Sequence, residues 1–60
     1  MFVKIFSADI LDSFDDGRSI LLPKDKFSNL SLLQVIDIED KTYVIENIIK
    51  SKNRIMLTIK

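Results

Sequence analysis

The clearest pattern of polar and apolar residues lies at the carboxyl end of the chain. Within Arg54–Lys60, the apolar residues Ile55, Leu57 and Ile59 occupy every second position, and Met56 and polar residues occupy the positions between them. Side chains of a β-strand point alternately to opposite faces, so this spacing is typical of a strand with one buried face. We therefore predict a strand over residues 54–60 that covers a core with its isoleucine and leucine side chains.

Two runs rich in β-branched residues precede this strand. Val35–Glu39 and Thr42–Lys50 are separated by the polar pair Asp40 and Lys41. That composition and spacing predict a β-hairpin with a two-residue loop at residues 40–41. Ser51–Asn53 then predicts a second turn, so residues 35–60 are expected to form a three-stranded meander.

The middle run, residues 42–50, is apolar on both faces. If it alternates regularly, Tyr43, Ile45 and Ile49 share one face, and Val44 and Ile48 share the other. Such a strand needs cover on both sides, which either the same chain or a second molecule supplies. We favour self-association as a homodimer, because surplus apolar surface is a common cause of it.

The amino-terminal residues predict one strand and a following segment that fits two structures. Phe2–Ser7 has the pattern of an opening strand, whose two faces are Met1, Val3 and Ile5 on one side and Phe2 and Phe6 on the other. Residues 8–15 fit equally a short helix capped by Ser7 and an irregular lid. In both cases its apolar residues pack on the protein; these are Ile10, Leu11 and Phe14.

Gly17 is expected to supply a positive φ where this segment ends. Arg18–Leu22 predicts a further strand, which Pro23 ends because proline has no N–H to donate to a ladder. Lys24–Asn29 predicts a turn or a single helical turn. Five short strands in one domain over residues 1–60 then predict an all-β fold, a small SH3-like barrel or a meander sheet. The alternative is an open five-stranded sheet that dimerises through one face.

Length and composition narrow the functional classes. A domain of 60 residues is marginally stable by itself, and this one has no cysteine for a disulfide and no histidine for the usual zinc sites. The apolar opening is too short and too charged for a signal peptide or a membrane span, so we expect a soluble, cytoplasmic protein. Its high Ile, Lys and Asp content is typical of small bacterial or phage proteins.

The charged residues are unevenly distributed along a chain of zero net charge. Residues 1–40 contain eight acidic and four basic side chains, whereas residues 41–60 contain five basic side chains and Glu46. Such a chain can pair head to tail with a copy of itself or offer a basic surface to an acidic partner. The simpler explanation, which we favour, is that these charges keep exposed strand faces soluble.

The sequence offers little for catalysis or for holding a cofactor. An acidic cluster ends at Gly17, but an EF-hand loop starting at Asp12 would place Phe14 and Pro23 where calcium ligands are required. Catalytic histidine and cysteine are absent, and one glycine is too few for a phosphate-binding loop. We therefore expect a non-enzymatic protein with no metal and no cofactor. The clustered carboxylates are Asp9, Asp12, Asp15 and Asp16.

Nucleic-acid binding is the main alternative to protein binding. Four cations surround the predicted loops of the meander, and Tyr43 is close to them in sequence. Small barrels bind single strands by stacking bases on aromatic rings beside such basic grooves. A net charge of zero argues against it, because affinity for phosphates requires many cations. The four cations are Lys41, Lys50, Lys52 and Arg54.

One segment resembles a known DNA-binding family. The sequence Asp-Asp-Gly-Arg-Ser-Ile-Leu-Leu-Pro-Lys at residues 15–24, followed by Leu30, is similar to the Gly-Arg, apolar pair, proline and later leucine of the AbrB/MazE swapped-hairpin proteins. It has one residue more between Gly17 and Pro23 than that family's pattern. The resemblance implies an intertwined dimer in which Arg18 contacts DNA.

Taken together, these features favour a small non-enzymatic protein-protein interaction module. A homodimeric inhibitor or adaptor that covers the surface of another protein fits a chain with surplus apolar residues and no reactive groups. We expect its contact residues on the apolar faces of the meander. They are Tyr43, Val44, Ile48 and Met56.

Overall fold

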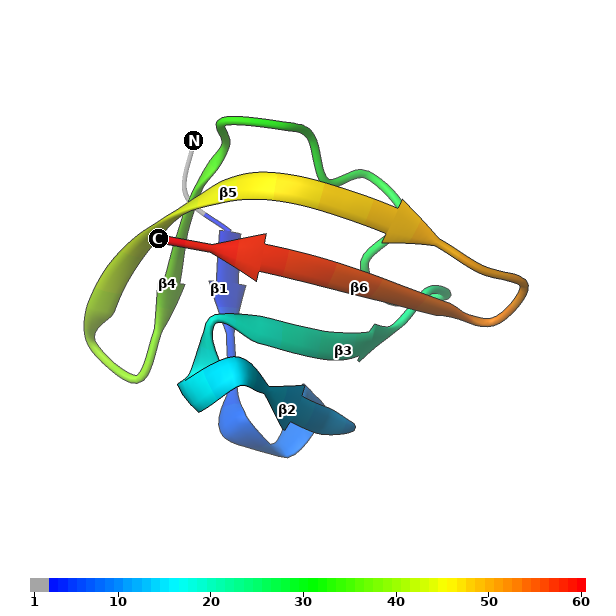
Figure 1. The fold of residues 1–60 in the computed structure, drawn as a ribbon, viewed down its shortest axis with the longest axis horizontal. Coiled ribbons are helices and arrows are strands. Elements are labelled where there is room, and N and C mark those ends of the chain that lie inside the picture. Colours follow the sequence, from blue (N-terminus) through cyan, green and yellow to red (C-terminus); the bar gives the residue numbers. More distant parts are fainter. Residues whose placement is uncertain (1–2) are drawn as a thin grey trace.

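The computed structural model describes residues 3–60, which form six β-strands and two 3-10 turns (Figure 1). The strands are β1 (Val3–Ile5), β2 (Asp12–Phe14), β3 (Ser19–Pro23), β4 (Val35–Ile38), β5 (Lys41–Lys50) and β6 (Arg54–Ile59). The 3-10 turns are η1 (Ser7–Asp9) and η2 (Asp15–Gly17). Met1 and Phe2, which we expected at the start of the first strand, lie outside the described residues.

All six strands belong to one sheet, in the order β1-β4-β5-β6-β3-β2. β1 and β4 run parallel, and the other neighbouring strands run antiparallel. The sheet curls into a half-barrel, so its inner side encloses the core and its outer side faces away from it (Figure 1). The prediction of an all-β barrel or meander is confirmed, although there are six strands where we expected five.

The core is built from side chains at alternating inner positions of the strands. On β6, Ile55 and Leu57 are fully buried and Ile59 is almost so, as its alternation predicted. Phe27 and Leu30, from the connection between β3 and β4, are also buried in this core. The other strands contribute Ile5, Ile20, Leu22, Ile36 and Ile45. Burial of this apolar surface is the main source of the fold's stability.

A β-bulge in β5 changes which of its side chains face the core. Ile45 pairs with Ile59 of β6 and Asn47 pairs with Thr58, so Glu46 is an extra residue without a partner. Beyond the bulge Ile48 packs against the core, whereas Ile49 is exposed. The regular alternation that grouped Ile49 with Tyr43 and Ile45 on one face and Ile48 with Val44 on the other is therefore wrong. The bulge also explains why β5 is apolar on both sides in the sequence, because its inner face shifts by one residue along the strand.

The hairpin between β4 and β5 is one residue earlier than predicted. Ile38 pairs with Lys41, so the two-residue loop is Glu39-Asp40 and not Asp40-Lys41. Glu39 has φ +49° and Asp40 has φ +68°. Two positive φ values are the signature of a type I′ turn, whose twist matches that of the flanking strands. The second predicted turn, at residues 51–53, is confirmed: the N–H and the hydroxyl of Ser51 both donate to the carbonyl of Arg54, at 2.9 and 3.0 Å.

Residues 8–15 form neither the short helix nor the irregular lid that we considered. The chain makes the 3-10 turn η1 and then the edge strand β2, which pairs with β3. An isolated eight-residue helix is marginal, whereas pairing with β3 satisfies the backbone groups of these residues at once. Of the three apolar residues, Ile10 packs on the core, and Leu11 and Phe14 remain exposed. Gly17 has φ +84°, as expected.

The strand after Gly17 and the turn that follows it are confirmed to within one residue. β3 begins at Ser19 and ends with Pro23, after which residues 24–29 form turns without an α-helix. The N–H of Lys24 donates to the carbonyl of Asn53 at 3.0 Å, which holds this turn beside the β5–β6 loop.

The bulge leads to a direct test with two adjacent isoleucines. We expect Ile48→Ala to lower the free energy of unfolding by about 1–3 kcal/mol, because its side chain packs on the core. Ile49→Ala, one residue along the strand, should change it by about 0.5 kcal/mol or less. Urea denaturation followed by circular dichroism measures both. A larger loss for Ile49→Ala would show that β5 alternates without a bulge.

The type I′ turn predicts a stabilising double substitution. Replacing Glu39-Asp40 by Asn-Gly should raise the free energy of unfolding by about 1 kcal/mol, since these residues favour positive φ and the present ones do not. Thermal unfolding measures the effect. Lys52→Gly is the matched control in the other hairpin loop, where φ is not positive, and should not stabilise the protein. Equal stabilisation by both changes would contradict the assigned turn.

Candidate functional site

The outer side of the sheet carries a row of apolar side chains, where a solvated sheet face ordinarily carries polar ones. Leu21 of β3 pairs with Met56 of β6, which pairs in turn with Ile49 of β5. Phe14 of β2 pairs with Ser19 and so lies diagonally beside Leu21, within reach of it. We call Phe14, Leu21, Ile49 and Met56 the outer strip; it crosses four adjacent strands.

The ends of the outer strip are the parts most open to solvent. Ile49 is 56% exposed and Phe14 is 44% exposed, while Leu21 and Met56 between them are half-buried by their neighbours. Asp12 pairs with Leu21 and lies beside the strip at its β2 end. The strip is therefore a continuous apolar surface with polar residues around it, which is the composition of an interaction face.

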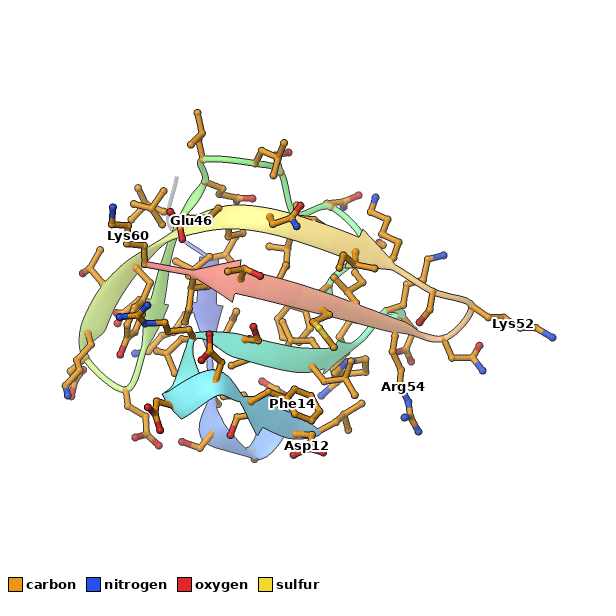
Figure 2. The ribbon with its side chains drawn as sticks, in the orientation of Figure 1. Asp12, Phe14, Glu46, Lys52, Arg54 and Lys60 are labelled. Carbon is orange, nitrogen blue, oxygen red and sulfur yellow. The ribbon has the colours of Figure 1, made fainter. Side chains whose placement is uncertain are left out.

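Charged side chains of opposite sign border this face, the basic ones at the β5–β6 hairpin and the acidic ones on β2 and η2. Lys52 and Arg54 extend from the β5–β6 hairpin, and Asp12 lies on β2 (Figure 2). Lys50 precedes that hairpin, and Asp15 and Asp16 form the turn η2 that follows β2. Within residues 3–60 the structure shows one ion pair, Lys26 Nζ to Asp9 at 3.2 Å, which involves neither group. These opposite charges are thus available to a partner.

The four predicted contact residues do not form one surface. Met56 lies at the centre of the outer strip, as expected for an outward residue. Val44 also points outward, but it pairs with Val35 away from the strip. Tyr43 and Ile48 are half-buried and pack against the core. None of the four is sealed inside completely, and whether any of them binds a partner stays a prediction.

Sequence reasoning missed most of the outer strip. Leu21 lies between Ile20 and Leu22, so three successive apolar residues hid its outward direction. Because of the bulge, regular alternation assigned Ile49 to the wrong face of β5. Phe14 was missed because residues 8–15 were expected to pack on the protein. Only Arg54–Ile59 alternates clearly enough to assign the outward Met56 from sequence.

The predicted nucleic-acid surface is divided between two ends of the molecule. Lys41 begins β5 and Lys50 ends it, nine residues later, so at about 3.3 Å per residue roughly 30 Å of strand separates them. Lys52 and Arg54 are on the Lys50 side, and Tyr43 is on the Lys41 side. The base-stacking ring is therefore separated from most of the cations. Arg18, implicated by the resemblance, borders a different feature.

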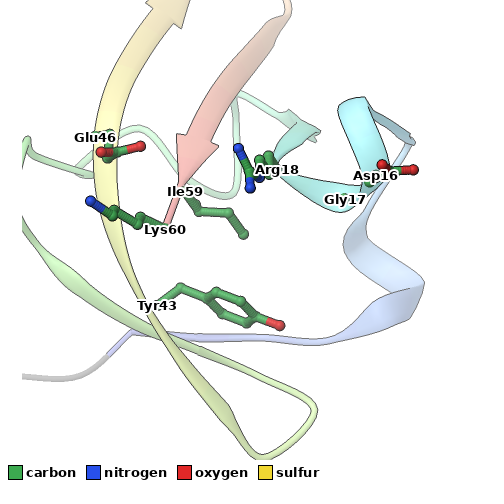
Figure 3. A pocket seen from close by; sticks show the side chains of 7 residues that line it. All are labelled: Asp16, Gly17, Arg18, Tyr43, Glu46, Ile59 and Lys60. Atoms are coloured by element: carbon green, nitrogen blue, oxygen red, sulfur yellow. The ribbon is translucent and has the colours of Figure 1, made fainter.

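That feature is a hollow of about 580 Å³ at an open end of the half-barrel (Figure 3). Its walls come from the β2–β3 turn, the end of β6 and the first half of β5. Ile59 and Tyr43 provide apolar surface, Arg18 and Lys60 provide cations, and the carboxylate of Glu46 lies at the Lys60 side. We call it the mouth hollow.

The acidic side chains do not form a metal site within the described part of the chain. No group of three or more histidine, cysteine, aspartate or glutamate side chains there is arranged to hold a metal ion. Asp9 bonds to Lys26, and the carboxylate of Asp12 accepts the N–H of Ser13 at 2.8 Å. In residues 3–60 there is also no helix with the length and apolar composition needed to span a membrane.

Comparison of the chain with protein-family models, with curated proteins and with solved structures gives no match. The resemblance of residues 15–30 to the AbrB/MazE family therefore gains no support from these comparisons. The features that point to a function are the outer strip, the mouth hollow and the charges around them.

Proposed function

We propose that this chain is a non-enzymatic protein-binding module that forms a homodimer through the outer strip. The observation that carries the proposal is the row from Leu21 through Met56 to Ile49, apolar across adjacent strands on the solvent side of the sheet. Covering apolar surface is favourable by roughly 25 cal/mol per Å², which makes such a row a natural docking face.

A small domain has a particular reason to use this surface. A chain of about 60 residues buries only about 60% of its unfolded surface, so its own core gives a narrow margin of stability. Association adds buried apolar area, and binding of the folded form shifts the folding equilibrium toward it. Covering Ile49 and Phe14, which are exposed in the single chain, supplies this stabilisation.

The distribution of charge favours a second copy of the chain as the occupant. A two-fold axis along the outer strip runs across the strands, so it reverses the strand direction of one molecule relative to the other. The basic β5–β6 hairpin with Lys52 and Arg54 then lies toward the acidic η2 turn with Asp15 and Asp16 of the partner. Opposite charges meet at both ends of such an interface, whereas the parallel arrangement would place like charges together.

The size of the molecule sets the extent of the interface. Its dimensions are 28 × 24 × 20 Å, while a standard interface uses roughly 800 Å² on each partner. The entire outer side of the sheet is therefore needed, and a partner that covered only the strip would bind weakly. Nucleic acid is a poorer occupant because the cations lie at separate ends of β5.

Met56 at the centre of the outer strip provides the test. We expect the wild-type protein to be dimeric at tens of micromolar in size-exclusion chromatography with light scattering, on the scale of small apolar interfaces. Met56→Lys should give a monomer, because it places a charge in the middle of the apolar contact. Circular dichroism establishes that the variant remains folded.

Leu33→Lys is the matched control for this substitution. Leu33 is also apolar and is 77% exposed, but it lies in the connection before β4, outside the outer strip. This variant should remain dimeric. A wild-type protein that is monomeric up to millimolar concentration, or a Leu33→Lys variant that dissociates like Met56→Lys, would overturn the proposed dimer face. Binding of single-stranded DNA with steep salt dependence would instead favour the nucleic-acid alternative.

A further inference from the structure

The mouth hollow is lined by polar side chains at one end of the core. Arg18 directly precedes β3, and its exposed side chain lines the hollow. Its carbonyl accepts the N–H of Ile59 at 2.7 Å, which fixes its backbone on β6. Tyr43 precedes the buried Ile45 by two positions on β5, so it has the same inner direction. A guanidinium and a phenol ring therefore lie together at this end of the half-barrel.

Two costly backbone irregularities border this hollow. Asp15 and Asp16 have φ values of +53° and +55°, and Gly17 follows with φ +84°. Two successive non-glycine residues in the left-handed region are unfavourable, and this run places Arg18 at the rim. On the opposite wall the bulge places Glu46 there. Both β-bulges and strained backbone concentrate at ligand sites.

The guanidinium of Arg18 has no carboxylate partner within residues 3–60. Figure 3 shows it beside Ile59, while the carboxylate of Asp16 points away from it. Glu46 lies nearer to Lys60, at the other side of the hollow. The hollow therefore has a local positive charge at Arg18 next to apolar surface, although its titratable groups balance in number. A guanidinium fork is shaped to bind a carboxylate or a phosphate through two parallel hydrogen bonds.

From this geometry we propose that the mouth hollow binds a carboxylate or phosphate group attached to a planar ring. The oxyanion accepts hydrogen bonds from Arg18, and the ring packs against Tyr43 and Ile59. The volume of about 580 Å³ lies within the range of small-molecule sites, and the mouths of β-barrels are among the usual places for them. Its lining contains no residue of the outer strip, but Asp16 of η2 belongs both to its rim and to the acidic end of the proposed dimer interface.

Phenyl phosphate is the probe for this site, followed by ¹H–¹⁵N NMR of the wild-type protein. We expect saturable shifts of the amide signals of Gly17, Arg18, Tyr43 and Ile59, with little change at the β5–β6 hairpin. Benzoate should cause the same pattern, which would show that the site accepts both oxyanions. Inorganic phosphate, which lacks the ring, and benzylamine, which lacks the anion, should each bind at least about tenfold more weakly.

Arg18→Gln and Lys24→Gln form a pair of variants that each remove one positive charge, since Lys24 lies beyond the other end of β3 and outside both the mouth hollow and the outer strip. Arg18→Gln should weaken the binding of phenyl phosphate by about tenfold or more, the scale of one charge-assisted hydrogen-bond pair, and Lys24→Gln should leave the affinity within about twofold. Equal loss in both variants would show non-specific attraction to positive charge and would overturn the site. Shifts that stay linear with concentration would also overturn it. Inorganic phosphate that binds as tightly as phenyl phosphate would refute the role of the ring.

Discussion

Strand β6 determines which side chains of the sheet are inside and which are outside. It pairs with β5 on one edge and with β3 on the other, and its three inner residues are buried. Because paired residues in an antiparallel sheet point to the same side, the buried positions of β6 assign the inner positions of both neighbours. Ile59 places Ile45 on the inner side, and Met56 places Leu21 and Ile49 on the outer side. Both proposed sites thus depend on the register of one strand.

The sequence predicts those parts of the fold in which the local preference of the residues matches their position in the sheet. The alternation in β6, the break at Pro23, the positive φ of Gly17 and the turn at residues 51–53 all have a local cause. The bulge at Glu46 has no such signal, because neither glycine nor proline marks it. The predicted position of the β4–β5 loop differs by one residue from the observed position, because Glu39 and Asp40 adopt positive φ without the glycine that usually indicates it.

The candidate surfaces are harder to predict from the sequence, because they also depend on strand pairings that have no local signal. An outward position such as Met56 can be assigned from sequence where the alternation around it is strict. Leu21 and Ile49 join it only through pairings between strands that are far apart in the chain. Arg18 was singled out by a resemblance, but its place at the mouth hollow follows from the hydrogen bond between its carbonyl and the N–H of Ile59 on β6. A register error of one residue exchanges the two faces, as happened for Ile48 and Ile49.

Each of the two proposed sites lowers the stability or the solubility of this small domain. Polar residues in place of Leu21 and Ile49 would make the outer face more soluble, and two successive aspartates with positive φ make the turn before Arg18 unfavourable. A fold of this size has a narrow margin of stability, so each such departure matters. Departures of this kind, where local rules for a stable sheet are broken at particular residues, are expected at sites that bind something. The outer strip and the mouth hollow are the two places where this chain departs most clearly from those rules, and each has the chemistry of a different ligand.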